Sequence, residues 1–146
     1  MGSYQALAVG ETFRSATRVL DAGLVDSLVG LGGYTHPLFT DPAYLATTPF
    51  ERMPVPGEAV LLLMGGLVEG TGRLDETTIA LLRFDAVAFE APAFVDDTIH
   101  VDVTVLGKEP SASGRRGVLV MQWRCVAQDN RTLIDTTTRM LFRTTG

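Results

Sequence analysis

The amino-acid sequence predicts an α+β fold in which a long, curved antiparallel sheet wraps around one central, buried helix. The segment 57–69 is the most hydrophobic in the chain, and its apolar residues do not keep to one face, which is typical of a buried helix. Four long strand patterns at hairpin spacing follow it, which favours antiparallel pairing. A curved sheet is the economical way to cover a lone helix. The 146 residues are typical of one domain, which we expect to span residues 1–146.

The chain before this helix predicts a strand and a first, shorter helix. Residues 1–9 carry no regular pattern and indicate a loose start, and residues 11–20 indicate a strand. Asp21 is a suitable N-cap, because its carboxylate can accept a hydrogen bond from a first-turn N–H. Gly32 and Gly33 then end the helix. Apolar residues follow Asp21 at helical spacing: Leu24, Val25, Leu28 and Val29.

The segment 33–56 is expected to be irregular. Most prolines of the chain lie in it: Pro37, Pro42, Pro49, Pro54 and Pro56. Within it, residues 41–46 predict one short helix, with Asp41 as N-cap and Pro42 at the first helical position. The buried helix begins at Gly57, and Gly70 and Gly72 end it.

Strand patterns fill the remainder of the chain. We expect strands over residues 77–89, 97–106, 117–127 and 133–143. The second of these alternates, which predicts one buried and one exposed face: Ile99, Val101, Val103 and Val105 against His100, Asp102 and Thr104. Turn-forming residues at 109–114 and 129–130 separate the last three strands.

Composition excludes several classes of protein. The formal net charge of -5 and the pI of about 4.9 argue against a nucleic-acid partner, because phosphate binding needs clustered Lys and Arg. The longest apolar stretch, residues 59–68, is far shorter than the roughly 20 residues of a membrane span. With no signal-peptide pattern, we expect a cytoplasmic protein without membrane contact. Two distant histidines and one cysteine form no metal-binding cluster, so we expect neither metal nor cofactor.

Several short segments, each weak alone, together carry a family resemblance. They are Val9–Glu11, Gly33–Pro42, Val55–Gly57, Phe89–Val101, Gly117–Val120 and Asn130. In this order and spacing, over roughly residues 8–143, they resemble the MaoC-like branch of the hotdog fold, the R-specific enoyl-CoA hydratase-like dehydratases. The resemblance implies a hotdog fold that handles an acyl-CoA or acyl-carrier-protein thioester. It also implies a dimer, either a homodimer or a heterodimer with a related hotdog chain, with sites between the subunits.

The family's catalytic pair is replaced in this sequence. Family hydratases use an Asp and a His in the irregular segment, and a backbone N–H at the helix start polarises the thioester carbonyl. Gly57 matches that helix start. Alignment on Gly33 and Pro37 puts Tyr34 at the Asp position, His36 at an Asn position and Phe39 at the His position. Neither a phenol with a pKa near 10 nor a phenyl ring can do the original work.

Three residues are therefore candidates for catalysis. His36 lies inside the matched motif, and histidine is the side chain most often used as a general base, although His36 could simply bond the nearby backbone. Tyr34 could donate a hydrogen bond to substrate or to His36, or only pack as an aromatic. Glu58 could activate water, although the helix dipole alone favours a carboxylate there. We expect a substrate-binding set as well: Gly57, Phe39, Thr35 and Asp41, the last most simply explained as an N-cap.

Three functions remain open. The first is a lyase that hydrates or dehydrates acyl thioesters with a divergent active site. The second is a non-catalytic partner subunit of a heteromeric dehydratase, which loss of both family residues would predict. The third is a thioesterase in which Glu58 or His36 activates water. Acyl length and the carrier stay undetermined; Lys108, Arg115 and Arg116 could meet a carrier phosphate, or lie in a solvated loop.

Overall fold

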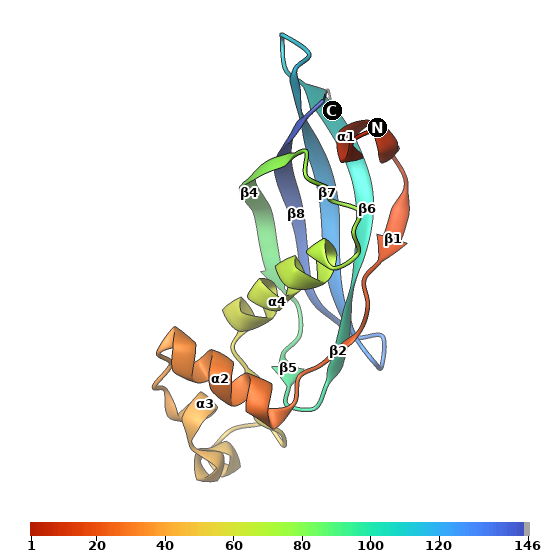
Figure 1. Cartoon of the computed structure of the whole chain (residues 1–146). Helices are drawn as coiled ribbons and strands as arrows, with labels where there is room; N and C mark the ends of the chain where they lie inside the picture. The colour runs from red at the N-terminus through yellow and green to blue at the C-terminus, as the bar shows by residue number, and fades with distance from the viewer. Residues whose placement is uncertain (145–146) are drawn as a thin grey trace.

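The computed structural model describes residues 1–144 and confirms the α+β architecture (Figure 1). The helices are α1 Ser3–Ala6, α2 Ala22–Gly32, α3 Pro37–Thr40, the 3₁₀ helix η1 Pro42–Thr47 and α4 Gly57–Glu69. The strands are β1 Thr12–Arg14, β2 Arg18–Val19, β3 Pro54–Val55, β4 Thr78–Phe89, β5 Ala93–Phe94, β6 Thr98–Pro110, β7 Arg116–Ala127 and β8 Thr132–Arg143. The central helix thus has the bounds that the sequence predicts.

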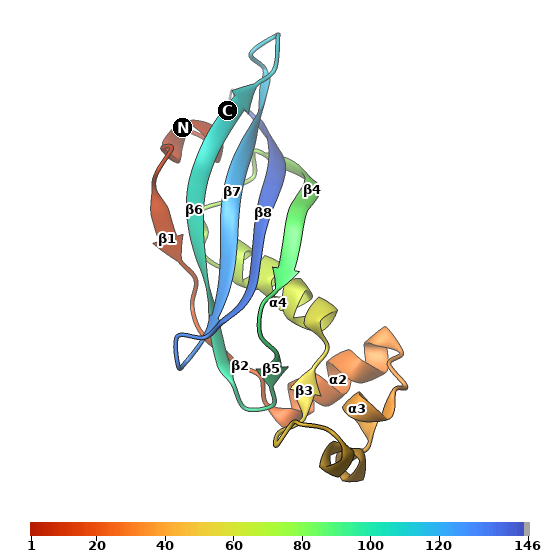
Figure 2. The ribbon, with the colours of Figure 1, turned by 180° about the vertical axis from the view of Figure 1, so that it is seen from behind.

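One curved antiparallel sheet carries the fold. Its strand order is β1-β6-β7-β8-β4, and β2 also pairs with β6. The long strands follow one another as hairpins, while β4 joins the far side of β8 although it precedes the others in sequence. Helix α4 lies across the concave face of this sheet (Figures 1 and 2). A two-stranded sheet, β3 with β5, joins the chain before α4 to the chain after β4.

The core lies between α4 and the inner face of the sheet. Helix α4 contributes Ala59, Val60, Leu63, Met64 and Val68 to it. The alternation predicted for β6 is confirmed, because Ile99, Val101 and Val103 are fully buried while the residues between them are partly exposed. Burial of such side chains contributes roughly 1.5–3 kcal/mol each.

Helix α4 is not buried all round, which corrects the sequence expectation. Leu62 in its middle is 66% exposed. Strand β4, at the edge of the sheet, also leaves apolar side chains exposed: Ile79, Leu81, Leu82 and Phe89. The sheet ends at β4, so it covers α4 from one side only. Helix α4 and strand β4 therefore carry more apolar side chains than this chain buries by itself.

The N-terminus is a second correction, because residues 1–9 are anchored. Residues Ser3–Ala6 form α1, and Leu7 after it is buried in the core. The Ser3 hydroxyl donates a 2.8 Å hydrogen bond to the carbonyl of Arg73 and accepts one from the Asp75 N–H. The sequence lacks the periodicity that would reveal so short a helix.

The predicted ends of α2 are confirmed. The Asp21 carboxylate accepts a 2.9 Å hydrogen bond from the Leu24 N–H, and Gly33 ends the helix in a left-handed conformation with φ of 71°. Within residues 1–144, no helix is long and apolar enough to cross a lipid bilayer.

Candidate functional site

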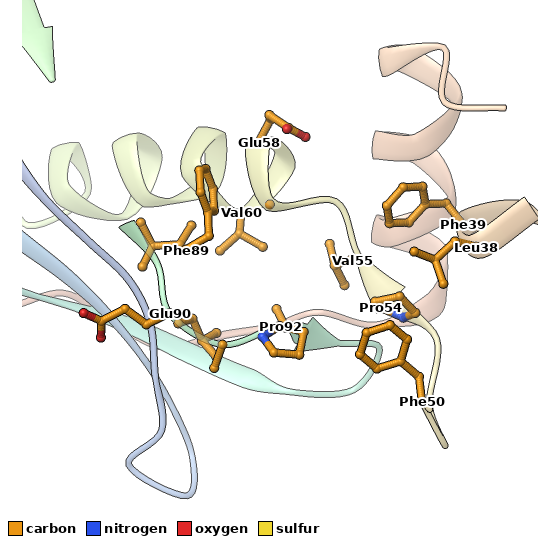
Figure 3. A pocket seen from close by; sticks show the side chains of 15 residues that line it. Leu38, Phe39, Phe50, Pro54, Val55, Glu58, Val60, Phe89, Glu90 and Pro92 are labelled. Atoms are coloured by element: carbon orange, nitrogen blue, oxygen red, sulfur yellow. The ribbon is translucent and has the colours of Figure 1, made fainter. Parts of the chain in front are cut away.

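A cavity of about 360 Å³ lies at the N-terminal end of α4. Most of its wall is apolar, and Figure 3 shows the side chains that converge on it. Six segments contribute to the wall: α3, the connection between η1 and β3, β3, α4, the β4–β5 region and the start of β8. The lining residues are Leu38, Phe39, Phe50, Pro54, Val55, Gly57, Glu58, Val60, Phe89, Glu90, Ala91, Pro92, Ala93, Leu133 and Ile134. Such a cavity suits an apolar ligand that is oriented by a few polar groups.

The irregular segment between α2 and α4 is held by two side-chain caps. His36 is the N-cap of α3, where its Nδ1 accepts a 3.0 Å hydrogen bond from the Leu38 N–H. Asp41 is the N-cap of η1, as the sequence predicts, and accepts from the Ala43 N–H at 3.0 Å. Each cap satisfies a helix N–H that has no partner within its own helix. Both side chains shape the segment that brings Phe39 to the cavity.

Glu58 is one of two charged residues that line the cavity, the other being Glu90, and Tyr34 is its hydrogen-bond partner. The Tyr34 hydroxyl donates a 2.7 Å hydrogen bond to Oε2 of Glu58. In Figure 3 the Glu58 carboxylate lies over the first turn of α4, away from the apolar wall of Phe50 and Pro92.

The hydrogen bond between Tyr34 and Glu58 sets their protonation states. It lowers the pKa of Glu58, with help from the residue's own backbone N–H and against a smaller effect of burial. The same hydrogen bond raises the pKa of Tyr34, and burial and the Glu58 charge add to this. At neutral pH the pair is therefore a carboxylate beside a protonated phenol, which is an acceptor next to a donor.

Gly57 opens α4 beside this pair. Helix geometry leaves the first N–H groups without intrahelical acceptors, and the helix dipole makes this end favourable for negative charge. A Cβ at Gly57 would lie 2.7 Å from the Phe89 ring, so only glycine lets that ring lie against the helix start. The N-terminus of α4 is thus bordered by one aromatic ring and one carboxylate.

The structure brings together only part of the predicted site. Of the predicted residues, all within the described chain, Phe39, Gly57 and Glu58 line the cavity, and Tyr34 reaches it through Glu58. Thr35, His36 and Asp41 are exposed and do not line it. Lys108 near the end of β6, Arg115 in the β6–β7 loop and Arg116 at the start of β7 lie at the opposite end of the sheet (Figure 1).

Sequence reasoning missed the far wall of the cavity. Phe50, Phe89, Glu90 and Ile134 come from segments far apart in the chain, and only the fold brings them together. One signal was present, since Phe89 and Glu90 open the Phe89–Val101 segment. Nothing in the local pattern shows that the Phe89 ring lies on Gly57.

Comparisons with known proteins agree with this architecture. No protein-family model matches the chain. The (R)-specific enoyl-CoA hydratase of Aeromonas caviae is 34% identical over 109 residues, which cover 73% of this chain and 78% of the hydratase. A MaoC-like dehydratase from Rhodospirillum rubrum superposes with a TM-score of 0.81 at 22% identity, covering 95% of each chain. The HadBC (3R-hydroxyacyl-ACP dehydratase) complex of Mycobacterium tuberculosis gives a TM-score of 0.76 at 14% identity, with 91% of this chain and 96% of that chain covered.

Proposed function

Since the chain belongs to the MaoC-like, R-specific enoyl-CoA hydratase-like family of hotdog proteins, we propose that it binds an acyl thioester and adds water to, or removes it from, the acyl group. The observation that carries the proposal is the Tyr34–Glu58 hydrogen bond at the rim of an apolar cavity, beside the N-terminus of α4. The thioester carrier is CoA or acyl carrier protein. The pair takes the place of the family's Asp and His.

The thioester carbonyl is placed at the start of α4. There the Gly57 N–H and the helix dipole stabilise the negative charge that develops on the carbonyl oxygen. The acyl chain then lies against the apolar wall that includes Phe89 and Val60. This orientation brings the reacting carbons towards Glu58, the residue next to Gly57.

Tyr34 and Glu58 divide the proton transfers. In hydration, Glu58 takes a proton from water as the water oxygen bonds to the β carbon of the enoyl group. The Tyr34 hydroxyl gives its proton to the α carbon. The proton on Glu58 then passes along the 2.7 Å hydrogen bond to the Tyr34 oxygen, which restores both groups. Water is the only other reactant, and dehydration is the reverse sequence.

The test is hydration of crotonyl-CoA by the purified chain, followed as loss of the enoyl absorbance. We expect Glu58→Gln and Tyr34→Phe each to lower kcat about 100-fold or more, because each removes one proton-transfer group. Asp26→Asn, on the exposed side of α2, and Tyr44→Phe, on η1, are the matched controls and keep full activity. Unchanged turnover in both site variants would overturn the proposal. Release of free thiol without hydration would indicate a thioesterase.

The exposed apolar side chains of β4 support a dimer. Edge strands with exposed apolar residues invite pairing with another strand, and β4 with Leu62 of α4 offers such a surface. We propose that β4 of a second hotdog chain, most simply another copy, continues the sheet. Light scattering of the purified chain should give a dimer, and Leu82→Lys on β4 should give a monomer. A wild-type monomer at assay concentration would contradict this.

A second candidate function is a partner subunit without chemistry of its own. The Phe39 ring lines the cavity at the position aligned with the family's His, and HadBC is by name a complex of two chains. In that case the chain would shape an acyl site for a related subunit. Activity that appears only on co-expression with a relative that has the Asp and His, and survives Glu58→Gln, would favour this function over the first.

A further inference from the structure

A second cavity, of about 220 Å³, lies at the other end of α4. The same three elements line both cavities, in matching order. Around the first, the start of α4 meets the end of β4 and the start of β8. Around the second, Gly65 in the last turns of α4 meets Leu81 of β4 and Met140 near the end of β8. Both cavities therefore lie on one side of the helix, between it and the same edge of the sheet.

The two cavities are spaced like the two ends of one extended chain. Gly57 and Gly65 are eight residues apart on α4, which is just over two helical turns, about 12 Å along the axis and about 80° around it. An extended chain advances about 1.2 Å per bond, so about ten bonds cover this distance. A Cβ at Gly65 would meet no described atom within 4 Å, which shows that this glycine borders open space.

The two cavities are lined by different charged and polar side chains. The first has only Glu58 and Glu90 as charged or polar side chains. Half of the residues that line the second carry polar groups: Glu69, Asp75, Thr78 and Trp123. Hydrogen bonds from the Thr77 hydroxyl and backbone, outweighing the effect of burial, lower the pKa of Asp75 to about 2, so this carboxylate is ionised and accepts hydrogen bonds.

Two of these polar groups lack a partner. Trp123 is 3% exposed, and its indole N–H has no acceptor among the described residues. The hydroxyl oxygen of Thr78 is likewise buried and unpaired within residues 1–144. Buried polar groups are rarely left unpaired, because the loss of a hydrogen bond to water is not compensated. Both residues line the same cavity, so a ligand there would lie next to both of them.

We propose that the second cavity holds the far end of the acyl group and that this end carries a hydroxyl. A hydroxyl can accept a hydrogen bond from the Trp123 indole and donate one to a carboxylate at the cavity wall, which a methyl group cannot do. The substrate class is therefore a medium-length acyl thioester hydroxylated near its far end. This rests on the proposed function, since it takes the acyl thioester as the ligand.

The experiment compares decanoyl-CoA with 10-hydroxydecanoyl-CoA by calorimetry. Both are saturated, so neither can be hydrated, and binding is measured without turnover. We expect the hydroxylated ligand to bind about tenfold more tightly, because it pairs groups that decanoyl-CoA leaves buried and unpaired. Trp123 is the only tryptophan of the chain, so its fluorescence should also change on binding. Equal affinities for the two ligands would overturn the proposal.

Substitutions in the second cavity test which residues cause the preference for the hydroxylated ligand. Thr78→Val and Trp123→Phe remove one hydrogen-bonding group each and should reduce the preference for the hydroxyl while decanoyl-CoA still binds. Gly65→Leu should fill the second cavity and weaken decanoyl-CoA binding about tenfold or more, but leave the short butyryl-CoA unaffected. Gly66→Leu is the matched control, because a Cβ there also meets no described atom within 4 Å and Gly66 does not line the cavity. A preference that survives in Thr78→Val/Trp123→Phe would refute the assignment.

The result of this binding experiment can be distinguished from the result of the hydration assay that tests the proposed function. If crotonyl-CoA is not hydrated but the hydroxyl preference is found and disappears in the variants, the cavity assignment stands and the proposed chemistry falls. If crotonyl-CoA is hydrated but the wild type binds both saturated ligands equally, the chemistry stands and the hydroxyl specificity falls.

Discussion

The Tyr34 ring occupies space that is free only because residue 32 is glycine. A Cβ at Gly32, the last residue of α2, would lie 2.6 Å from Cε2 of Tyr34. The ring at this place directs its hydroxyl to the Glu58 carboxylate. Gly32 is thus a positioning residue for the Tyr34–Glu58 pair, although it touches neither the cavity nor the substrate.

Gly32→Ala should therefore displace Tyr34 and break its hydrogen bond to Glu58. We expect kcat for crotonyl-CoA hydration to fall about tenfold with little change in KM, since loss of orientation affects the chemical step more than binding. Gly30→Ala is the matched control, because a Cβ at Gly30 meets no described atom within 4 Å. It should keep activity and gain about 0.5–1 kcal/mol of stability from the better helix former. Equal activity of the two variants would show that Gly32 has no positioning role.

The pH profile distinguishes a carboxylate base from a histidine base. Glu58 must be ionised to act as a base, and its pKa is lowered, so activity should be lost only as the pH falls well into the acid range. Tyr34 must keep its proton to act as an acid, and its pKa is raised, so activity should persist until strongly alkaline pH. Measured kcat/KM should therefore be flat between about pH 6 and 8. A limb near pH 6.5, where an ordinary histidine titrates, would instead indicate a histidine base.

The role of His36 can be tested with a substitution that keeps its N-cap hydrogen bond but removes the imidazole. Asparagine accepts the N-cap hydrogen bond from the Leu38 N–H but cannot act as a base, whereas alanine can do neither. We expect His36→Asn to keep activity within about twofold and His36→Ala to lose about 1 kcal/mol of stability at the cap. A large loss of kcat in His36→Asn, with the melting temperature unchanged, would indicate that His36 is catalytic.

The sequence predicted those structural features that depend on residues close together in the chain. The bounds of α4, the N-cap role of Asp21 and the alternation of β6 each depend on residues within a few positions of one another, and each is confirmed. The exposure of Leu62 could not be predicted in this way, because it depends on where the sheet ends.

The candidate site was harder to predict because it is assembled from distant segments. Glu58 and Tyr34 could be proposed singly, but 24 positions separate them and nothing in their spacing shows that they bond. Phe89 reaches Gly57 only because β4 returns along α4 to the helix start. His36 illustrates the opposite problem, since a chemically suggestive residue can be explained by the proline that follows it and the short helix it caps.

Asp97 connects β5 to the hairpin between β7 and β8. Its carboxylate is fully buried and accepts hydrogen bonds from Arg131 and Gln128 near the hairpin, from Arg52 before α4, and from the Phe94 N–H at β5. Burial opposes ionisation, but these hydrogen bonds and the two arginine charges outweigh it, so the pKa of Asp97 is lowered. A carboxylate with a lowered pKa stabilises the fold above its unfolded pKa of about 3.9, and this contribution is lost as the pH falls through the folded pKa.

Asp97→Asn should therefore destabilise the protein strongly at neutral pH. Removing one partner from a buried ionic cluster costs about 3–5 kcal/mol, because the remaining charges lose their counterpart. Chemical denaturation at pH 7 measures this loss, and the difference from wild type should shrink as the pH is lowered below about 4. Asp96→Asn is the control: Asp96 is exposed with φ of 74°, a conformation that asparagine also adopts, so its stability should stay within about 0.5 kcal/mol of wild type. Similar stabilities of the two variants would mean that the Asp97 cluster contributes little to the fold.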